Sequence, residues 1–122
     1  MFLYEITACL TVTVTLLYVM GYYIQQYFNR TSPAHPISPK ARWYLIHCIT
    51  NAVVVMLSAS YVWQLLTDSS PYFDETVSMA PSIVVMSLHL YHCLFYQLNR
   101  GDIIHHTVML LVLLIPMVLR PE

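Results

Sequence analysis

Four stretches of this chain are long enough to cross a lipid bilayer and contain no Asp, Glu, Lys or Arg. They cover residues 6–28, 43–66, 76–99 and 103–119. A helix crosses the hydrocarbon core, which is roughly 30 Å thick, with about 20 apolar residues. Because backbone polar groups in lipid must be bonded within the structure, helices are the expected form. The sequence therefore predicts an all-α, polytopic transmembrane helix bundle of four spans.

The composition supports a membrane location and excludes one class of partner. Hydrophobic residues make up 58% of the chain and charged residues 9%, whereas a soluble domain has roughly 25% charged residues. The net charge is −1, and no basic patch is present to neutralise phosphates, so no nucleic-acid partner is expected. The first stretch lacks a basic leader, which favours a retained span over a signal peptide. Membrane lipids are the expected partners.

Charges in the connecting segments predict an orientation. The segment 29–42 carries only positive charges, and the segment 67–76 carries only the negative charges of Asp68, Asp74 and Glu75. By the positive-inside rule, the segment 29–42 is cytosolic and the N-terminus is lumenal or outside the cell. The expected location is the endoplasmic reticulum, another endomembrane or the plasma membrane.

Polar residues inside the apolar stretches are concentrated in the second half of the chain. Ionisable residues in spans are rare and usually face a bundle interior, a cavity or a partner. The second stretch has a histidine, His47, and an asparagine, Asn51. They are four residues apart and therefore lie on one helix face. The third stretch adds a stripe of histidines and tyrosines. The candidate binding residues are His47, Asn51, His89, Tyr91, His92 and Tyr96.

Asp102 directly precedes the fourth stretch, and the histidine pair His105 and His106 lies near the start of that stretch. The Asp102 carboxylate is placed to cap the helix N-terminus. It is also placed to orient either histidine, three or four residues further along. Adjacent helical side chains diverge by about 100°, so we expect one histidine to face the interior and the other a neighbouring helix or the head groups. The pair is the candidate catalytic site.

No metal site is expected from the sequence. The three cysteines have no CxxC spacing, so they suggest neither a disulfide framework nor a zinc site. The segments His89-Leu-Tyr-His92 and His105-His106 are similar to the histidine boxes of di-iron membrane oxygenases. Those enzymes need more histidines than the six present, and Asp102 stands where the outer histidine of a box would be.

Three motifs together resemble the TLC-domain family. They are Trp43 with His47 and Asn51, the segment 88-LHLYHCLFY-96, and above all 102-DIIHHTVML-110. The family includes ceramide synthases, translocating-chain-associating membrane proteins and lipid-homeostasis proteins. The resemblance implies six core helices around a lipid cavity lined by the histidine pair. Residues 1–42 would form an extra first helix with a basic loop, and residues 43–122 a truncated domain of three core helices.

The resemblance leaves several functions open. One is lipid binding and lipid homeostasis through a His-lined intramembrane cavity, and it is favoured because Met109 stands where ceramide synthases have threonine. Another is an acyl-CoA-dependent N-acyltransferase with His105 and His106 as the base, which needs acyl-CoA as a co-substrate and no bound cofactor. A third is an assembly subunit of a membrane complex. Because half a bundle would expose its polar stripe to lipid, a homo-oligomer or a separate second half is expected.

Overall fold

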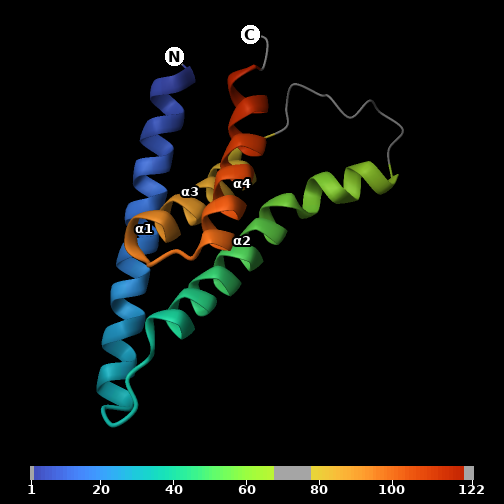
Figure 1. Cartoon of the computed structure of the whole chain (residues 1–122). Helices are drawn as coiled ribbons and strands as arrows, with labels where there is room; N and C mark the ends of the chain where they lie inside the picture. Colours follow the sequence, from blue (N-terminus) through green and yellow to red (C-terminus); the bar gives the residue numbers. More distant parts are fainter. Residues whose placement is uncertain (1, 68–77, 120–122) are drawn as a thin grey trace.

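The computed structural model describes residues 2–67 and 78–119, and these form four helices (Figure 1). The helices are α1 (Phe2–Thr31), α2 (Pro39–Thr67), α3 (Ala80–Phe95) and α4 (Arg100–Val118). The predicted all-α class is confirmed. The acidic residues predicted to face the lumen or the outside, Asp68, Asp74 and Glu75, fall outside the described residues.

Three of these helices are long and apolar enough to cross a membrane. The qualifying segments are Leu3–Thr31, Pro39–Gln64 and Arg100–Val118, and they indicate a membrane-embedded protein. Helix α3 has 16 residues and is about 24 Å long, which is short of the roughly 30 Å hydrocarbon core. The third predicted span, 76–99, was therefore too long, because residues 96–99 are not helical.

Local contacts explain where α3 begins and ends. Ser78 Oγ accepts a hydrogen bond from the Ala80 N–H at 3.1 Å, and Pro81 occupies the first turn, where its missing N–H costs nothing. At the other end the backbone of Tyr96 is extended. Arg42 fixes this end, because its Nε donates to the Tyr96 hydroxyl at 3.1 Å and its Nη1 to Gln25 Oε1 at 2.8 Å. These contacts join α1, α2 and the end of α3.

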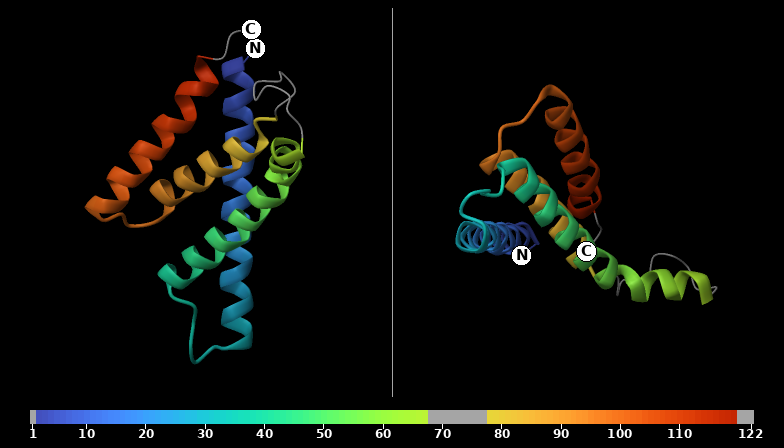
Figure 2. Two further views of the ribbon diagram at one scale, coloured as in Figure 1. Left: turned by 90° about the vertical axis from the view of Figure 1, so that its right-hand side faces the viewer. Right: turned by 90° about the horizontal axis from the view of Figure 1, so that it is seen from below.

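Helix α3 is the centre of the arrangement, because it packs against each of the other three helices. Figures 1 and 2 show it crossing α1 obliquely, with the start of α1 and the end of α4 at the same end of the molecule. The C-terminal half of α2 extends away from the other helices and exposes large apolar side chains: Val55, Met56, Val62, Trp63 and Leu66. Such a surface is suited to lipid rather than to water.

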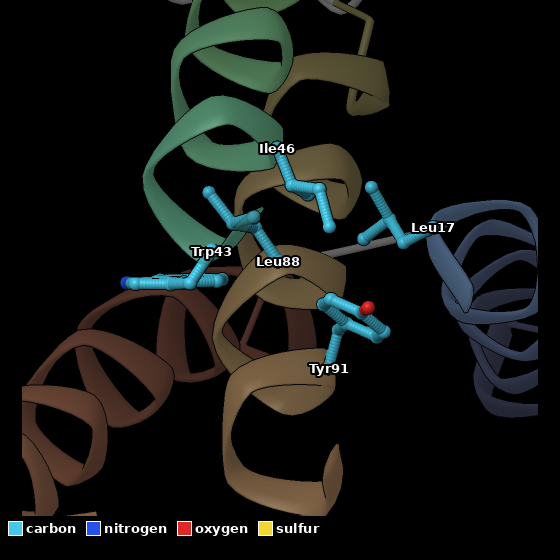
Figure 3. Packing of buried hydrophobic residues seen from close by; sticks show 5 residues of the cluster. All are labelled: Leu17, Trp43, Ile46, Leu88 and Tyr91. Atoms are coloured by element: carbon cyan, nitrogen blue, oxygen red, sulfur yellow. The ribbon is translucent and has the colours of Figure 1, made fainter. Parts of the chain in front are cut away.

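Two apolar clusters hold α3 in place. In the first, α1 contributes Leu17, α2 contributes Trp43 and Ile46, and α3 contributes Leu88 and Tyr91 (Figure 3). The second lies nearer the start of α1 and the end of α4, where Ile6, Met86 and Met117 meet. The three helix pairs that involve α3 are thus secured by buried side chains.

Gly21 allows α1 to approach α2 and α3 closely. A Cβ atom at this position would lie 2.6 Å from the Tyr91 hydroxyl oxygen and 3.2 Å from Ile46 Cδ1. Real Cβ atoms essentially never make the first of these contacts. Gly21 is therefore required by packing and not by an unusual backbone conformation.

The start of α4 is a capping box, which fixes the turn after α3. Asn99 Oδ1 accepts from the Asp102 N–H at 2.8 Å, and Asp102 Oδ2 accepts from the Asn99 N–H at 3.1 Å. Each side chain thus bonds a backbone donor that the helix leaves free. The predicted capping role of Asp102 is confirmed, with Asn99 as the N-cap residue itself.

Replacing Asn99 with alanine should lower the free energy of unfolding by about 1 kcal/mol, because one N-terminal donor of α4 loses its acceptor. The measurement is reversible unfolding by SDS titration in mixed micelles. Asn99→Ser keeps an acceptor and should remain within a few tenths of a kcal/mol of the native chain. Equal stability of the alanine variant and the native chain would contradict this role.

Candidate functional site

Five histidines from three helices form one group, which we call the histidine cluster: His47, His89, His92, His105 and His106. The ring centroids of His106 lie 4.8 Å from His89 and 4.7 Å from His92. The His105 ring lies 5.3 Å from the His89 ring. His47 joins the group through Trp43, whose ring lies 5.3 Å from the His47 ring. The predicted convergence of histidines from three helices is therefore present in the structure.

Three of these histidines form a hydrogen-bonded chain across the interface of α3 and α4. His106 Nδ1 lies 2.6 Å from His89 Nδ1, and His106 Nε2 lies 2.6 Å from His92 Nδ1. All three side chains are buried, with exposed fractions of 4% for His106, 5% for His89 and 7% for His92. We call this set the histidine chain.

The chemistry of imidazole gives the histidine chain a direction. A neutral ring has one N–H donor and one acceptor nitrogen. His106 must therefore donate to one partner and accept from the other, and the chain has two possible directions. To convert one direction into the other, a proton enters at the outer nitrogen of one end ring, the proton in each hydrogen bond shifts, and a proton leaves from the outer nitrogen of the other end ring. Such a chain can relay a proton between its ends, which is general acid–base chemistry.

Trp43 of α2 fixes one end of the histidine chain. Its ring is stacked on the His92 ring, with the centroids 3.8 Å apart and the planes at 3°. Stacking on a large rigid ring holds the His92 imidazole in one orientation. The sequence indicated Trp43 only as part of the motif similar to the TLC-domain family, and its packing on His92 was not predicted.

His47 and Asn51 lie on one face of α2, as their spacing predicted. Asn51 Nδ2 donates to His47 Nδ1 at 3.1 Å, so the remaining proton of a neutral His47 is on Nε2. Asn51 is exposed and His47 is half-buried. The pair is thus accessible from outside the helix packing.

The two adjacent histidines of α4 have different environments, as we expected from helix geometry. His106 is buried in the histidine chain, whereas His105 is exposed. The ring centroids of the two are 5.4 Å apart. His105 is therefore the accessible member of the pair, and His106 is the buried one.

Asp102 does not act on either histidine through a described hydrogen bond. Its carboxylate accepts from the Asn99 N–H in the capping box. In the described residues, His106 has both ring nitrogens bonded to other histidines. The predicted orienting role of Asp102 is therefore not seen, and its capping role is.

The two tyrosines predicted to line the site have other roles. Tyr91 points toward α1, where it is 3% exposed and packs with Leu17 (Figure 3). Its position is 100° around the helix from His92, so the two cannot share a face. Tyr96 borders the cluster, with its ring centroid 5.4 Å from His92, but its hydroxyl accepts from Arg42. Tyr91 is therefore a packing residue, and Tyr96 closes the end of α3.

Some of the histidines are close enough to share a metal ion. His89, His105 and His106 each offer one nitrogen, and these atoms lie within 4.8 Å of one another. The cysteines belong to no such group in the described part of the chain, and all three are free thiols. This arrangement of the three histidines was not expected from the sequence, because residues 89 and 105 become neighbours only through the packing of α3 on α4.

Comparison with known proteins gives no match for this chain, whether with protein-family models, with curated proteins or with solved structures.

Proposed function

We propose that the chain is a lipid-handling membrane protein that binds the polar head group of a lipid at the histidine cluster. The observation that carries this proposal is the exposed imidazole of His105 beside the buried histidine chain. An exposed ionisable residue on a membrane helix needs a polar partner, since lipid tails offer none. A lipid head group is a partner of this kind.

The surroundings of His105 support a ligand with both polar and apolar parts. On α4 the neighbouring side chains Ile104 and Val108 are 66% and 52% exposed. On α2 the exposed Asn51 is followed by the exposed Val55, one turn further along the same face. A head group bonded to His105 or Asn51 would leave its chains along these apolar surfaces.

The TLC resemblance supports the same function. Its most specific motif, 102-DIIHH-106, places the histidine pair at the start of a helix, and in that family the pair lines a lipid cavity. We also place the start of α1 and the end of α4 on the lumenal or outer side, with segment 29–42 in the cytosol. In Figures 1 and 2 the start of α1 and the end of α4 lie at the same end of the molecule, which is the arrangement expected if the chain crosses the membrane four times.

The histidine chain favours a second candidate, an acyl-CoA-dependent N-acyltransferase. Such an enzyme must remove a proton from the attacking amine, and a relay of imidazoles is suited to receive it. The amine would attack the thioester carbonyl, the coenzyme A thiolate would leave, and the amine proton would pass to a histidine. Incubation with a sphingoid base and acyl-CoA should then give an N-acyl product and free coenzyme A, and no product would exclude this candidate.

Photo-crosslinking tests lipid binding directly. The purified protein in detergent is mixed with a sphingosine that carries a diazirine and an alkyne, irradiated, digested and analysed by mass spectrometry. We expect labelled peptides from residues 43–66 and 103–119. The double variant His105→Ala, Asn51→Ala should reduce this labelling about 10-fold, because two hydrogen bonds of roughly 0.5–1.5 kcal/mol each are lost.

His35 provides the matched control, since it is an exposed histidine in the connection between α1 and α2. His35→Ala should label like the native chain. Labelling of 43–66 and 103–119 that is unchanged in the double variant would contradict a head-group site at the cluster. Labelling spread evenly over all the helices would show only general contact with lipid.

A further inference from the structure

Three imidazole rings form a nearly equilateral triangle where α3 packs on α4. The centroid separations are 4.8 Å between His89 and His106, 5.3 Å between His89 and His105, and 5.4 Å between His105 and His106. The nitrogen atoms that these rings offer lie within 4.8 Å of one another. All three rings therefore lie at one place in the α3–α4 interface, with a nitrogen of each near those of the other two.

The size of this triangle matches that of a tetrahedral metal site. A metal–nitrogen bond is about 2.0–2.1 Å long, and an imidazole centroid lies roughly 1.15 Å beyond the nitrogen. Two imidazole ligands at the tetrahedral angle then have centroids about 5.2 Å apart. The three observed separations lie on either side of this value. We propose that His89, His105 and His106 form a binding site for one zinc-like divalent transition-metal ion.

Metal binding would replace one hydrogen bond of the histidine chain. The Nδ1 atoms of His89 and His106 are 2.6 Å apart, whereas two ligand nitrogens of a tetrahedral ion are about 3.3 Å apart. The two side chains must separate by about 0.7 Å and turn, because their nitrogens now face each other and would have to face the ion instead. The proton between them moves to another ring nitrogen, so both rings stay neutral and no proton is lost.

His92 and Trp43 would hold the ligand His106 in its orientation. With a metal ion on His106 Nδ1, the remaining N–H of His106 is on Nε2 and donates to His92 Nδ1, 2.6 Å away. Histidine ligands almost always use their second nitrogen in this way. The ion would thus select one of the two directions of the histidine chain. The stack with Trp43 would hold His92, the acceptor of the His106 N–H, in place.

The donor set identifies the class of ion. All three ligands are imidazoles, which suit Zn²⁺, Cu²⁺, Ni²⁺ and Fe²⁺ and not Ca²⁺ or Mg²⁺, which prefer oxygen. The nearby carboxylate of Asp102 is bonded in the capping box. Three histidines leave a fourth tetrahedral position, which is the pattern of catalytic zinc sites. Because His105 is exposed, that position would open to the outer side of α4.

Titration with Co²⁺ tests the site without any lipid substrate. The purified protein is stripped with EDTA in detergent, and Co²⁺ is added while the visible absorption of four-coordinate cobalt is recorded. We expect saturation at one ion per chain and loss of the signal when Zn²⁺ is added. No saturable signal from the native chain would overturn the proposal.

Variants locate the ion. His105→Ala removes an exposed ligand outside the histidine chain, so the fold is retained, and Co²⁺ affinity should fall at least about 100-fold. His92→Phe keeps a ring on Trp43 but removes the acceptor, and should weaken binding roughly 10–100-fold, as outer-shell changes do. His35→Ala should bind like the native chain. Native affinity in His105→Ala, or equal loss in His35→Ala, would overturn the proposal.

Discussion

Replacing His106 with alanine is expected to lower the free energy of unfolding by about 2–4 kcal/mol, the largest effect of any single change considered. His106 makes two hydrogen bonds between α3 and α4, one to His89 and one to His92. Interhelical hydrogen bonds in membrane proteins contribute roughly 0.6–1.7 kcal/mol each. The loss of a buried ring adds a packing term. SDS titration in mixed micelles measures the change.

His105→Ala is the matched control, because it removes the same side chain from the adjacent, exposed position. It should change the free energy of unfolding by less than about 0.5 kcal/mol, as surface substitutions usually do. His106→Gln retains one donor and one acceptor and should be intermediate. Equal stability of the two alanine variants would mean that the histidine chain does not hold α4 on α3.

Replacing Gly21 with alanine is the second large effect, and about 1–3 kcal/mol of destabilisation is expected from overpacking. The added Cβ atom would lie 2.6 Å from the Tyr91 hydroxyl oxygen and 3.2 Å from Ile46 Cδ1. Because Tyr91 is buried and Ile46 has an exposed fraction of 0%, neither side chain can move away freely. Helix α1 must therefore shift outward. The same SDS titration measures the loss.

Removing the Tyr91 hydroxyl should rescue this variant. Tyr91→Phe alone gives up only a hydroxyl pair with Tyr96 at 3.4 Å, so it should cost less than about 1 kcal/mol. In the double variant the closest atom to the new Cβ is gone, and at least about 1 kcal/mol of stability should return. Strict additivity of the two changes would contradict the contact, since contacting residues couple and distant ones do not.

The helices were largely predictable because their signal is local. Four charge-free stretches identified all four helices, and each helix contains most of its stretch. The length of α3 was not predictable from hydropathy, since the residues after Phe95 are also uncharged. The end of α3 depends on Tyr96, whose hydroxyl is bonded to Arg42 from 54 positions away.

The candidate site was predictable where it depends on helix periodicity. The spacing of His89 and His92, and the divergence of His105 from His106, follow from the 100° step between residues. The same step excludes Tyr91 from the face of His92, although both had been assigned to one stripe. The stack of Trp43 on His92 and the approach of Gly21 to Tyr91 were not predictable. They depend on how α1 and α2 pack on α3, which no local pattern encodes.

The histidine chain lies beside the proposed lipid site and contains two of the three proposed metal ligands, and nuclear magnetic resonance observes it most directly. The metal-free protein is labelled with ¹⁵N in its histidine rings, and couplings between nitrogens across N–H···N hydrogen bonds are recorded in detergent micelles. We predict two couplings, from His106 Nδ1 to His89 Nδ1 and from His106 Nε2 to His92 Nδ1, both absent in His106→Gln. The account would be contradicted if none of the six histidine rings showed such a coupling and each ring had the tautomer mixture of free imidazole.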